Sequence, residues 1–182
     1  MIIYFVTSSN RKFVEVSDQF DLHFEQLNME ITEIQGTKEE IAIHKLKNVC
    51  QLHPEKWIMI DDTSIDIDAL NGFPGPYAKD FLNMGLDCIE NLVSKVGRES
   101  VLSCILGLGN YNQGIFEIFS GSIKGKLIEG ENNGKVGFDR IFLPNGSDIA
   151  YGDLKPEVKS KISHRGIAMR KIQEFIKEKQ LG

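Results

Sequence analysis

Two adjacent aspartates are the first candidates for chemistry in this sequence. Asp61 and Asp62 directly follow the apolar run Trp57–Ile60, and two more aspartates, Asp66 and Asp68, come soon after. A short apolar run of this kind is typical of a buried strand, so we expect the pair at a strand's carboxyl end, where α/β proteins usually bind ligands. Carboxylate oxygens suit Mg²⁺, which takes one or two carboxylates together with phosphate oxygens. An aspartate-rich surface turn explains the same residues equally well.

A loop of hydroxyl and cationic side chains is the second candidate. The segment Thr7–Lys12, Thr-Ser-Ser-Asn-Arg-Lys, follows a strand predicted over Ile2–Thr7. If a helix begins here, its unpaired backbone N–H groups, the hydroxyls and the two cations form a site for an anion. The alternative is an ordinary capped helix with solvated charges, which this segment alone favours.

The third candidate is the basic segment Lys159–Arg165. His164 and Arg165 fall in the first turn of the last predicted helix, where a positive charge opposes the helix dipole. An anionic ligand would offset that cost, but a solvated basic turn is an equally good explanation. A fourth segment, Gly137–Arg140, is weak by itself, because a glycine turn before a strand accounts for it.

Glycine pairs that suggest other nucleotide motifs do not have the required spacing. Gly121–Lys126 and Gly130–Lys135 each lack one residue of the P-loop and its terminal Ser or Thr. Gly107 and Gly109 lack the third glycine of the dinucleotide motif. We therefore predict turn glycines at these positions. The chain also lacks the HExxH and GxSxG motifs, which argues against zinc and covalent serine hydrolases.

The elements that must position these residues alternate between strand and helix. Beyond Ile2–Thr7 and Trp57–Ile60, paired strands are predicted over Val101–Leu108 and Ile115–Ile123, and a hairpin or tight loop over Ala69–Tyr77. Helices are predicted over Arg11–Phe20, from a Thr37/Glu40 capping box to Leu52, over Leu86–Val96, from Pro156, and after Ser163. This alternation predicts an α/β fold with a mixed central sheet and flanking helices.

Composition sets further limits. The 182 residues suit a single domain over 1–182, and the net charge of −5 argues against a nucleic-acid partner. No apolar stretch is long enough to cross a membrane, so no membrane partner is expected. The three cysteines, Cys50, Cys88 and Cys104, have no CxxC spacing and predict reduced, buried thiols in a cytoplasmic protein.

Taken together and in this order, these segments resemble the inosine triphosphate pyrophosphatase family over about Ile2–Phe175. The most specific stretch, Asp62–Lys79, contains Ala-Leu-Asn-Gly-Phe-Pro-Gly, similar to the family's Ala-Leu-x-Gly-x-Pro-Gly loop. Ile162–Gly166 is similar to its Ser-His-Arg signature, and Glu33–Gly36 to its metal-binding glutamate segment. The resemblance implies two lobes around a nucleotide cleft, a homodimer, and hydrolysis of ITP, dITP and XTP to the monophosphate and pyrophosphate.

The resemblance also implies roles for individual residues. Mg²⁺, with Mn²⁺ as the alternative, would be held by Glu33 and Asp62 with Asp61 adjacent, and Asp62 and Lys12 would be catalytic. The phosphates would be gripped by Thr7, Ser8, Lys12, Lys45 and Lys79, and the base and sugar would meet Lys159, Ser163, His164 and Arg165. The remaining implied substrate-binding residues are Ser9, Asn10, Arg11, Thr63, Val136, Gly137, Phe138 and Asp139.

Three departures from the family pattern bear on base specificity. Ser9 stands where Asn is usual, Val136 replaces an aromatic residue expected to stack on the base, and Arg140 replaces a proline. A donor such as the Arg165 guanidinium pairs with a keto oxygen and not with an amino group, which favours 6-keto purines. Two rival hypotheses remain: the same chemistry with a shifted base preference, and a nucleotide-binding protein without turnover.

Overall fold

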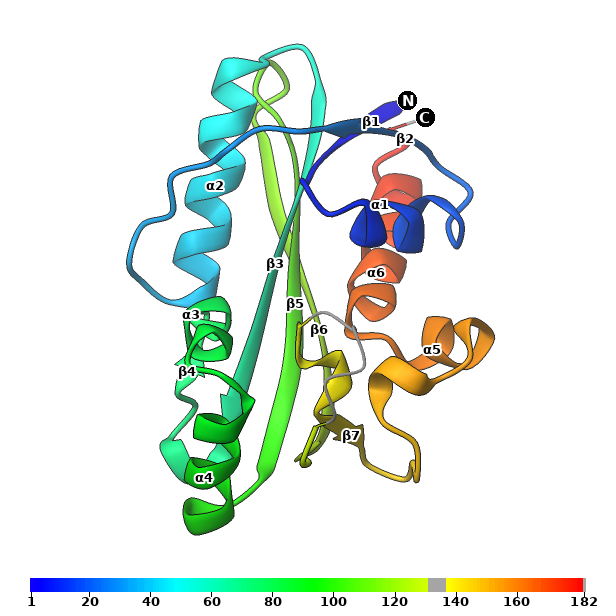
Figure 1. Cartoon of the computed structure of the whole chain (residues 1–182). Coiled ribbons are helices and arrows are strands. Elements are labelled where there is room, and N and C mark those ends of the chain that lie inside the picture. Colours follow the sequence, from blue (N-terminus) through cyan, green and yellow to red (C-terminus); the bar gives the residue numbers. More distant parts are fainter. Residues whose placement is uncertain (131–136, 182) are drawn as a thin grey trace. The chain divides into compact units, whose positions relative to one another are not determined.

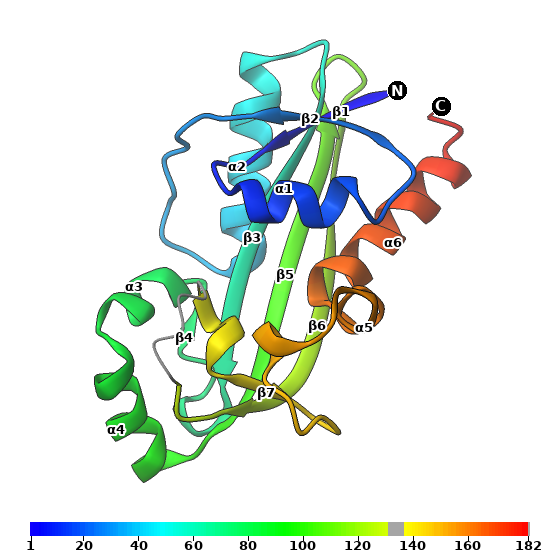
Figure 2. The same cartoon turned by 45° about the vertical axis from the view of Figure 1, so that its right-hand side comes forward.

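The computed structural model describes residues 1–130 and 137–181 (Figure 1). The chain divides into two compact units. Unit 1 comprises Met1–Asp62, Cys104–Gly121 and Arg165–Gly182, and unit 2 comprises Thr63–Ser103 and Ser122–His164. The two chain ends, both in unit 1, lie near each other in both views (Figure 2). The expectation of one domain over residues 1–182 stays a prediction.

The strands form a mixed sheet, as predicted. In the described part of the chain it has seven strands, six of them in the order β2 (His23–Leu27), β1 (Ile2–Val6), β3 (Trp57–Ile67), β5 (Glu99–Asn110), β6 (Ile115–Leu127) and β7 (Phe142–Pro144). β1 pairs in parallel with β2 and β3, and β7 is antiparallel to β6. The seventh strand, β4 (Pro74–Gly75), lies antiparallel to β3 in the predicted Ala69–Tyr77 loop.

The helices match the predicted pattern, except that α3 (Ala78–Asn83) has no counterpart among the predicted elements. They are α1 (Asn10–Ser17), α2 (Lys38–Leu52), α3 (Ala78–Asn83), α4 (Leu86–Val96), α5 (Pro156–Ile162) and α6 (His164–Glu178), with 3₁₀ helices η1 (Asp68–Leu70), η2 (Gly137–Arg140) and η3 (Tyr151–Asp153). The Thr37/Glu40 capping box at the start of α2 is complete. α1 ends at Ser17 and not at Phe20, since the weak helix formers Ser17 and Asp18 close it.

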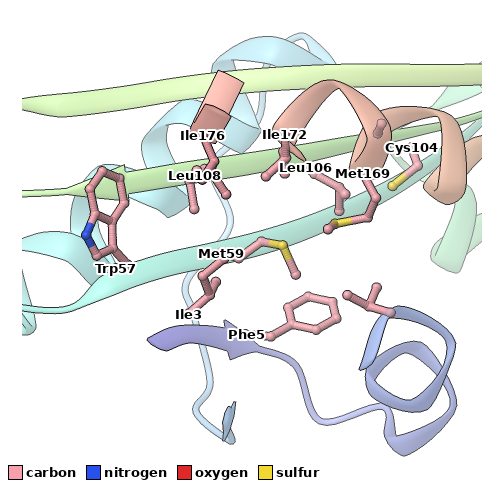
Figure 3. Close-up of a cluster of buried hydrophobic side chains, with 12 residues drawn as sticks. Ile3, Phe5, Trp57, Met59, Cys104, Leu106, Leu108, Met169, Ile172 and Ile176 are labelled. Atoms are coloured by element: carbon pink, nitrogen blue, oxygen red, sulfur yellow. The ribbon is translucent and has the colours of Figure 1, made fainter. Parts of the chain in front are cut away.

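Unit 1 buries apolar side chains on both faces of its strands. On one face α1 and α6 pack against the strands, and Figure 3 shows Met169 and Ile172 of α6 directed at the strands that carry Met59 and Leu106. On the other face α2 packs through Leu46 and its neighbours. Two-sided burial explains the near-continuous apolar sequences of β1 and of Trp57–Ile60 in β3.

One prediction about strand structure is wrong, and one strand was not predicted. β3 does not end at Ile60 but continues to Ile67, so Asp61 and Asp62 lie inside a strand and not at its end. The polar residues remain in the strand because both aspartates find charged partners in unit 1. The strand β2 has no counterpart among the predicted elements, because it is a largely exposed edge strand whose only apolar residues are Phe24 and Leu27.

The predicted turn glycines also have a different role. Gly107 and Gly109 lie inside β5, and Gly121 and Gly125 inside β6. A Cβ at Gly107 would come within 3.1 Å of Leu46 Cδ2 on α2. Glycine in β5 thus lets α2 approach the sheet closely, which is a packing function that spacing rules do not reveal.

Unit 2 has its own core. Its buried members come from β3, β5 and β6, from helices α3 and α4, and from the segment that carries η2, β7 and η3. Phe138 of η2 is 5% exposed and stacks on Phe81 of α3, with 6.4 Å between the ring centroids. Tyr151 of η3 is 1% exposed and packs edge-on against Phe142.

Candidate active site

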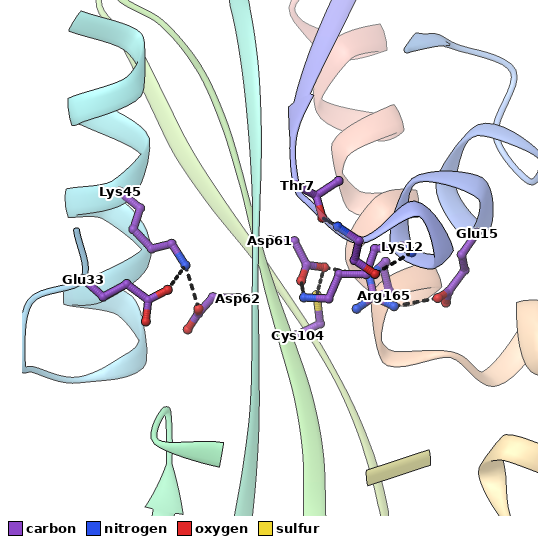
Figure 4. A network of polar contacts seen from close by, with 10 residues as sticks. Thr7, Lys12, Glu15, Glu33, Lys45, Asp61, Asp62, Cys104 and Arg165 are labelled. Atoms are coloured by element: carbon purple, nitrogen blue, oxygen red, sulfur yellow. Dashed lines mark hydrogen bonds and ion pairs between the residues drawn. The ribbon is translucent and has the colours of Figure 1, made fainter. Parts of the chain in front are cut away.

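Strand β3 presents two charged clusters on opposite faces. Because successive side chains of a strand alternate, the adjacent residues Asp61 and Asp62 point to opposite sides of the sheet. Figure 4 shows Asp62 directed toward α2 and Asp61 toward α1 and α6. The parallel register pairs Ile60 with Val6, which places the loop after β1 beside Asp61.

The first cluster joins two carboxylates through one ammonium group. Lys45 of α2 donates from Nζ to Glu33 Oε1 at 2.7 Å and to Asp62 Oδ1 at 3.0 Å. Burial lowers the pKa of Lys45, but the charges of Asp62 and Glu33 outweigh it, so the pKa lies above its usual value. Burial raises the pKa of Asp62, and Lys45 only partly offsets this effect. Lys45 therefore stays charged, and Asp62 is the more basic of the two central aspartates.

This pair of carboxylates fits a divalent cation. Glu33 and Asp62 converge on a single positive charge, and their oxygens are the donors that Mg²⁺ prefers. In residues 1–130 and 137–181 no group of three His, Cys, Asp or Glu side chains is placed to hold a metal. A bound Mg²⁺ would therefore need oxygen ligands from water or phosphate as well. That Asp61 is a third ligand stays a prediction, and its carboxylate faces away from Asp62.

The second cluster is centred on Asp61, whose side chain is 1% exposed. Arg165 donates from Nε to Asp61 Oδ2 at 2.7 Å, and the Lys12 ammonium binds the other carboxylate oxygen. Burial raises the pKa of Asp61, but Arg165 and Lys12 outweigh burial and hold the pKa well below its usual range. Asp61 is therefore an anion that positions two cations, which is a different role from that of Asp62.

Two further side chains complete this cluster. Glu15 Oε2 of α1 accepts from Arg165 Nη1 at 2.6 Å, and the Cys104 thiol donates to Asp61 Oδ2 at 3.3 Å. The sequence analysis did not identify either residue as part of the site. Glu15 lies three residues after Lys12 on α1, and this spacing places both on one helix face, a signal that was available. Nothing local to Cys104 marks it, because its contact lies 43 residues away in the chain.

The loop after β1 caps helix α1. Ser9 is the N-cap residue and accepts from the Lys12 backbone N–H at 3.3 Å, while the Ser9 N–H donates to Thr7 Oγ1 at 3.0 Å. Ser8, Asn10 and Arg11 are exposed. The cap at Ser9 does not decide between an ordinary capped helix and an anion site. A cap satisfies only some of the backbone N–H groups in the first turn, and the others can still bind an anion.

The residues expected near the base lie mostly in unit 2, on its C-terminal segment. Lys159 of α5 donates to Asp139 Oδ2 at 2.7 Å. Tyr151 Oη lies 3.3 Å from His164 Nδ1. Ser163 is fully buried and closes α5 through its backbone N–H, which donates to the Lys159 carbonyl at 2.7 Å. The structure therefore brings Asp139, Lys159 and His164 into one network around Tyr151, a residue that the sequence analysis did not single out.

Three other expected site residues, Thr63, Lys79 and Gly137, lie in unit 2. Lys79 is exposed on α3, and Thr63, the next residue after Asp62, is half-buried. Gly137 adopts φ +72°, which a side chain would disfavour. Val136 lies outside the described residues.

Of the three free cysteines, Cys50 and Cys104 are buried as expected, whereas Cys88 is exposed because it lies on the outer face of α4.

The architecture is that of Ham1 proteins. The solved structure of a HAM1 protein from Coxiella burnetii has a TM-score of 0.83 at 22% sequence identity and covers 98% of this chain and 99% of that one. The Ham1 protein of Staphylococcus aureus has a TM-score of 0.80 at 24% identity and covers 98% of this chain and all of that one. At this level of identity the likeness establishes the α/β fold with its mixed sheet.

Sequence comparison establishes the family. A sequence model of the Ham1 family matches residues 3–175. The protein named inosine triphosphate pyrophosphatase in Encephalitozoon cuniculi is 36% identical, over 96% of this chain and 93% of that protein. The protein named dITP/XTP pyrophosphatase in Korarchaeum cryptofilum is 35% identical, over 94% of both chains. The chain belongs to the Ham1 family, which confirms the resemblance found in the sequence.

No helix in the described residues is both long and apolar enough to cross a bilayer.

Proposed function

We propose that this chain is a nucleoside triphosphate pyrophosphatase that removes ITP, dITP and XTP from the nucleotide pool. Its products would be the nucleoside monophosphate and pyrophosphate, and its cofactor Mg²⁺, with Mn²⁺ as the alternative. The names of its relatives support this activity. The observation that carries the proposal is the Lys45 ammonium held between the Glu33 and Asp62 carboxylates.

The phosphate chemistry follows from this cluster and its neighbour. Asp62, whose pKa burial raises, accepts a proton at a carboxylate oxygen from the attacking water. Lys45 and Lys12 neutralise the negative charge of the polyphosphate, with Lys12 positioned by Asp61. Mg²⁺ held by Glu33 and Asp62 would neutralise the charge that develops on the leaving pyrophosphate.

Binding of the base is assigned on the family resemblance. Lys159, Ser163, His164 and Arg165 would face the base and sugar, and donors at a keto oxygen would select hypoxanthine and xanthine over adenine. A buried donor left facing an amino group costs about 1–3 kcal/mol. Discrimination by one such donor is therefore roughly five- to 150-fold.

A substrate panel on the wild type and the Asp62→Asn variant tests the proposal. We expect pyrophosphate release from ITP, dITP and XTP with Mg²⁺, and loss of turnover in Asp62→Asn with nucleotide binding retained. A higher kcat/KM for GTP or a pyrimidine triphosphate than for ITP would establish the shifted base preference instead. Nucleotide binding by the wild type without pyrophosphate release would establish the binding-only alternative.

We further propose that the chain forms a homodimer and works in the cytoplasm. The dimer rests on the family resemblance, and the compartment on three cysteines that all remain free thiols. Light scattering coupled to gel filtration tests the first proposal, since a mass of one chain, 20.5 kDa, would contradict it. Localisation of the tagged protein tests the second.

A further inference from the structure

Tyr151 connects two of the side chains that the proposed function places at the base. It belongs to η3, it is 1% exposed, and its neighbours in space come from other segments of unit 2. A buried tyrosine hydroxyl normally has a hydrogen-bonding partner, because burial without one is costly. The contacts of the Tyr151 ring and hydroxyl therefore show which side chains Tyr151 holds in place.

The ring face of Tyr151 supports Lys159. Lys159 Nζ lies 4.2 Å from the ring centroid, within the range of a cation–π contact. The same ammonium donates to Asp139 Oδ2 at 2.7 Å. The ring and the carboxylate together fix a side chain that otherwise has many rotamers, so the ammonium has one defined position.

The hydroxyl of Tyr151 faces the ring of His164. Tyr151 Oη lies 3.3 Å from His164 Nδ1, and the two ring centroids are 5.7 Å apart. The partner of one imidazole nitrogen decides which nitrogen of a neutral histidine carries the proton. The Lys159 cation over the ring draws electron density from the phenol, which makes its hydroxyl a better donor and a weaker acceptor. A hydroxyl that donates to Nδ1 leaves the proton on Nε2.

We propose that Tyr151 is a positioning residue for base selection. It donates to His164 Nδ1, so that Nε2–H is a donor suited to a keto oxygen, and its ring holds Lys159 in place. This inference rests on the proposed function, because it supplies the physical basis for preferring a 6-keto purine. Tyr151 itself need not contact the nucleotide.

Kinetics of Tyr151→Phe test the role of the hydroxyl. The variant keeps the ring beneath Lys159 and the packing on Phe142. We expect kcat/KM for ITP to fall roughly two- to tenfold, as for one lost hydrogen bond. The loss should be mainly in KM, with kcat/KM for ATP unchanged, so the ITP/ATP ratio falls. An unchanged ratio, or a loss of thermal stability alone, would overturn the proposal.

Two more variants complete the kinetic test. Tyr111→Phe is the matched control, because Tyr111 is 49% exposed in unit 1, and we expect it to behave as wild type. Tyr151→Leu also removes the ring beneath Lys159, and we expect a larger rise in the KM for ITP than in Tyr151→Phe. Equal losses in the two variants would overturn the role assigned to the ring.

The histidine tautomer is measured independently of turnover. Two-bond ¹H–¹⁵N correlation spectra of the wild type at a pH where His164 is neutral should show the Nε2–H form, with the signal assigned by His164→Gln. A mixture of tautomers in Tyr151→Phe supports the proposal, and the Nδ1–H form in the wild type overturns it even if no Tyr151 variant folds. Absence of ITP turnover would refute the proposed function instead, and the spectra would still report what Tyr151 does.

Discussion

Arg165 Nε donates to Asp61 Oδ2 at 2.7 Å, although 104 residues separate the two in the chain. The pair joins the strand β3 to the start of α6 within unit 1. Both side chains are nearly excluded from solvent, with exposures of 5% and 1%. A charge buried this deeply is tolerated only with a partner of opposite charge. Asp61 and Arg165 therefore each offset the cost of burying the other.

Asp61→Asn should strongly destabilise the protein. The change leaves the buried Arg165 and the half-buried Lys12 facing a neutral amide, and breaking a buried pair typically costs about 3–5 kcal/mol. Urea unfolding measures the loss. Glu90→Gln is the matched control, because Glu90 pairs with Arg98 at the surface, where a pair contributes under about 1 kcal/mol. Similar losses in the two variants would contradict the assignment of Asp61 as a buried anchor.

The contribution of Asp61 should depend on pH in a defined direction. Its pKa in the folded protein lies well below the usual range, whereas in the unfolded chain it is about 3.9. The stabilisation is therefore complete above the unfolded pKa and is lost as the pH falls from about 4 toward the folded pKa. The difference in free energy of unfolding between wild type and Asp61→Asn should be constant near neutral pH and shrink below about pH 4. A pH-independent difference would refute this origin.

Lys45→Met should tighten the binding of Mg²⁺ in the absence of nucleotide. The Lys45 ammonium lies between Glu33 and Asp62, so it competes with a cation for both carboxylates. Removing one buried positive charge should lower the Kd for Mg²⁺ by about tenfold, as measured by titration calorimetry. Lys47→Met, on the exposed side of the same helix, should leave the Kd unchanged. Equal or weaker binding by Lys45→Met would show that the metal binds elsewhere.

The three thiols should react at very different rates with a thiol reagent. Cys88 is exposed, whereas Cys50 and Cys104 are buried. Burial also raises the pKa of Cys50 to about 12, so the reactive thiolate is scarce at pH 8. We expect one fast equivalent in the native protein, absent from Cys88→Ser, and all three after unfolding. Rapid labelling of Cys104 would contradict its contact with Asp61.

Gly109→Ala should destabilise unit 1. A Cβ there would lie 2.8 Å from the Ile115 carbonyl oxygen and 3.0 Å from Cys50 Sγ, which is too close without movement of α2 or β6. Overpacking of this kind costs about 1–3 kcal/mol, measured by urea unfolding. Ser122→Ala, at an exposed position of β6, should change the stability by under about 0.5 kcal/mol. An unchanged free energy of unfolding in Gly109→Ala would show that Gly109 has no packing role.

Local sequence patterns determined most of the secondary structure. The capping box at Thr37, the apolar periodicity of α4 and the apolar runs of β1 and β5 each act over a few residues, so each can be read without the fold. The patterns failed where burial, and not local preference, decides the conformation. The polar stretch after Ile60 stays in a strand, and glycines predicted in turns lie inside strands against α2.

The sequence by itself also determined the family, because order and spacing of motifs survive along the chain. The family resemblance predicts Glu33, Lys45, Asp62 and Lys12 as site residues. The tertiary structure shows that Lys45 joins Glu33 to Asp62, whereas Lys12 pairs with Asp61. Only the fold shows that Asp61 and Asp62, one residue apart, belong to different clusters with opposite pKa shifts. Only the fold brings Tyr151 to His164. The physical reason is that contact energies depend on distance in space and not on distance along the chain. Alternation along β3 separates the side chains of the neighbours Asp61 and Asp62, whereas folding brings Asp61 and Arg165 together from 104 positions apart.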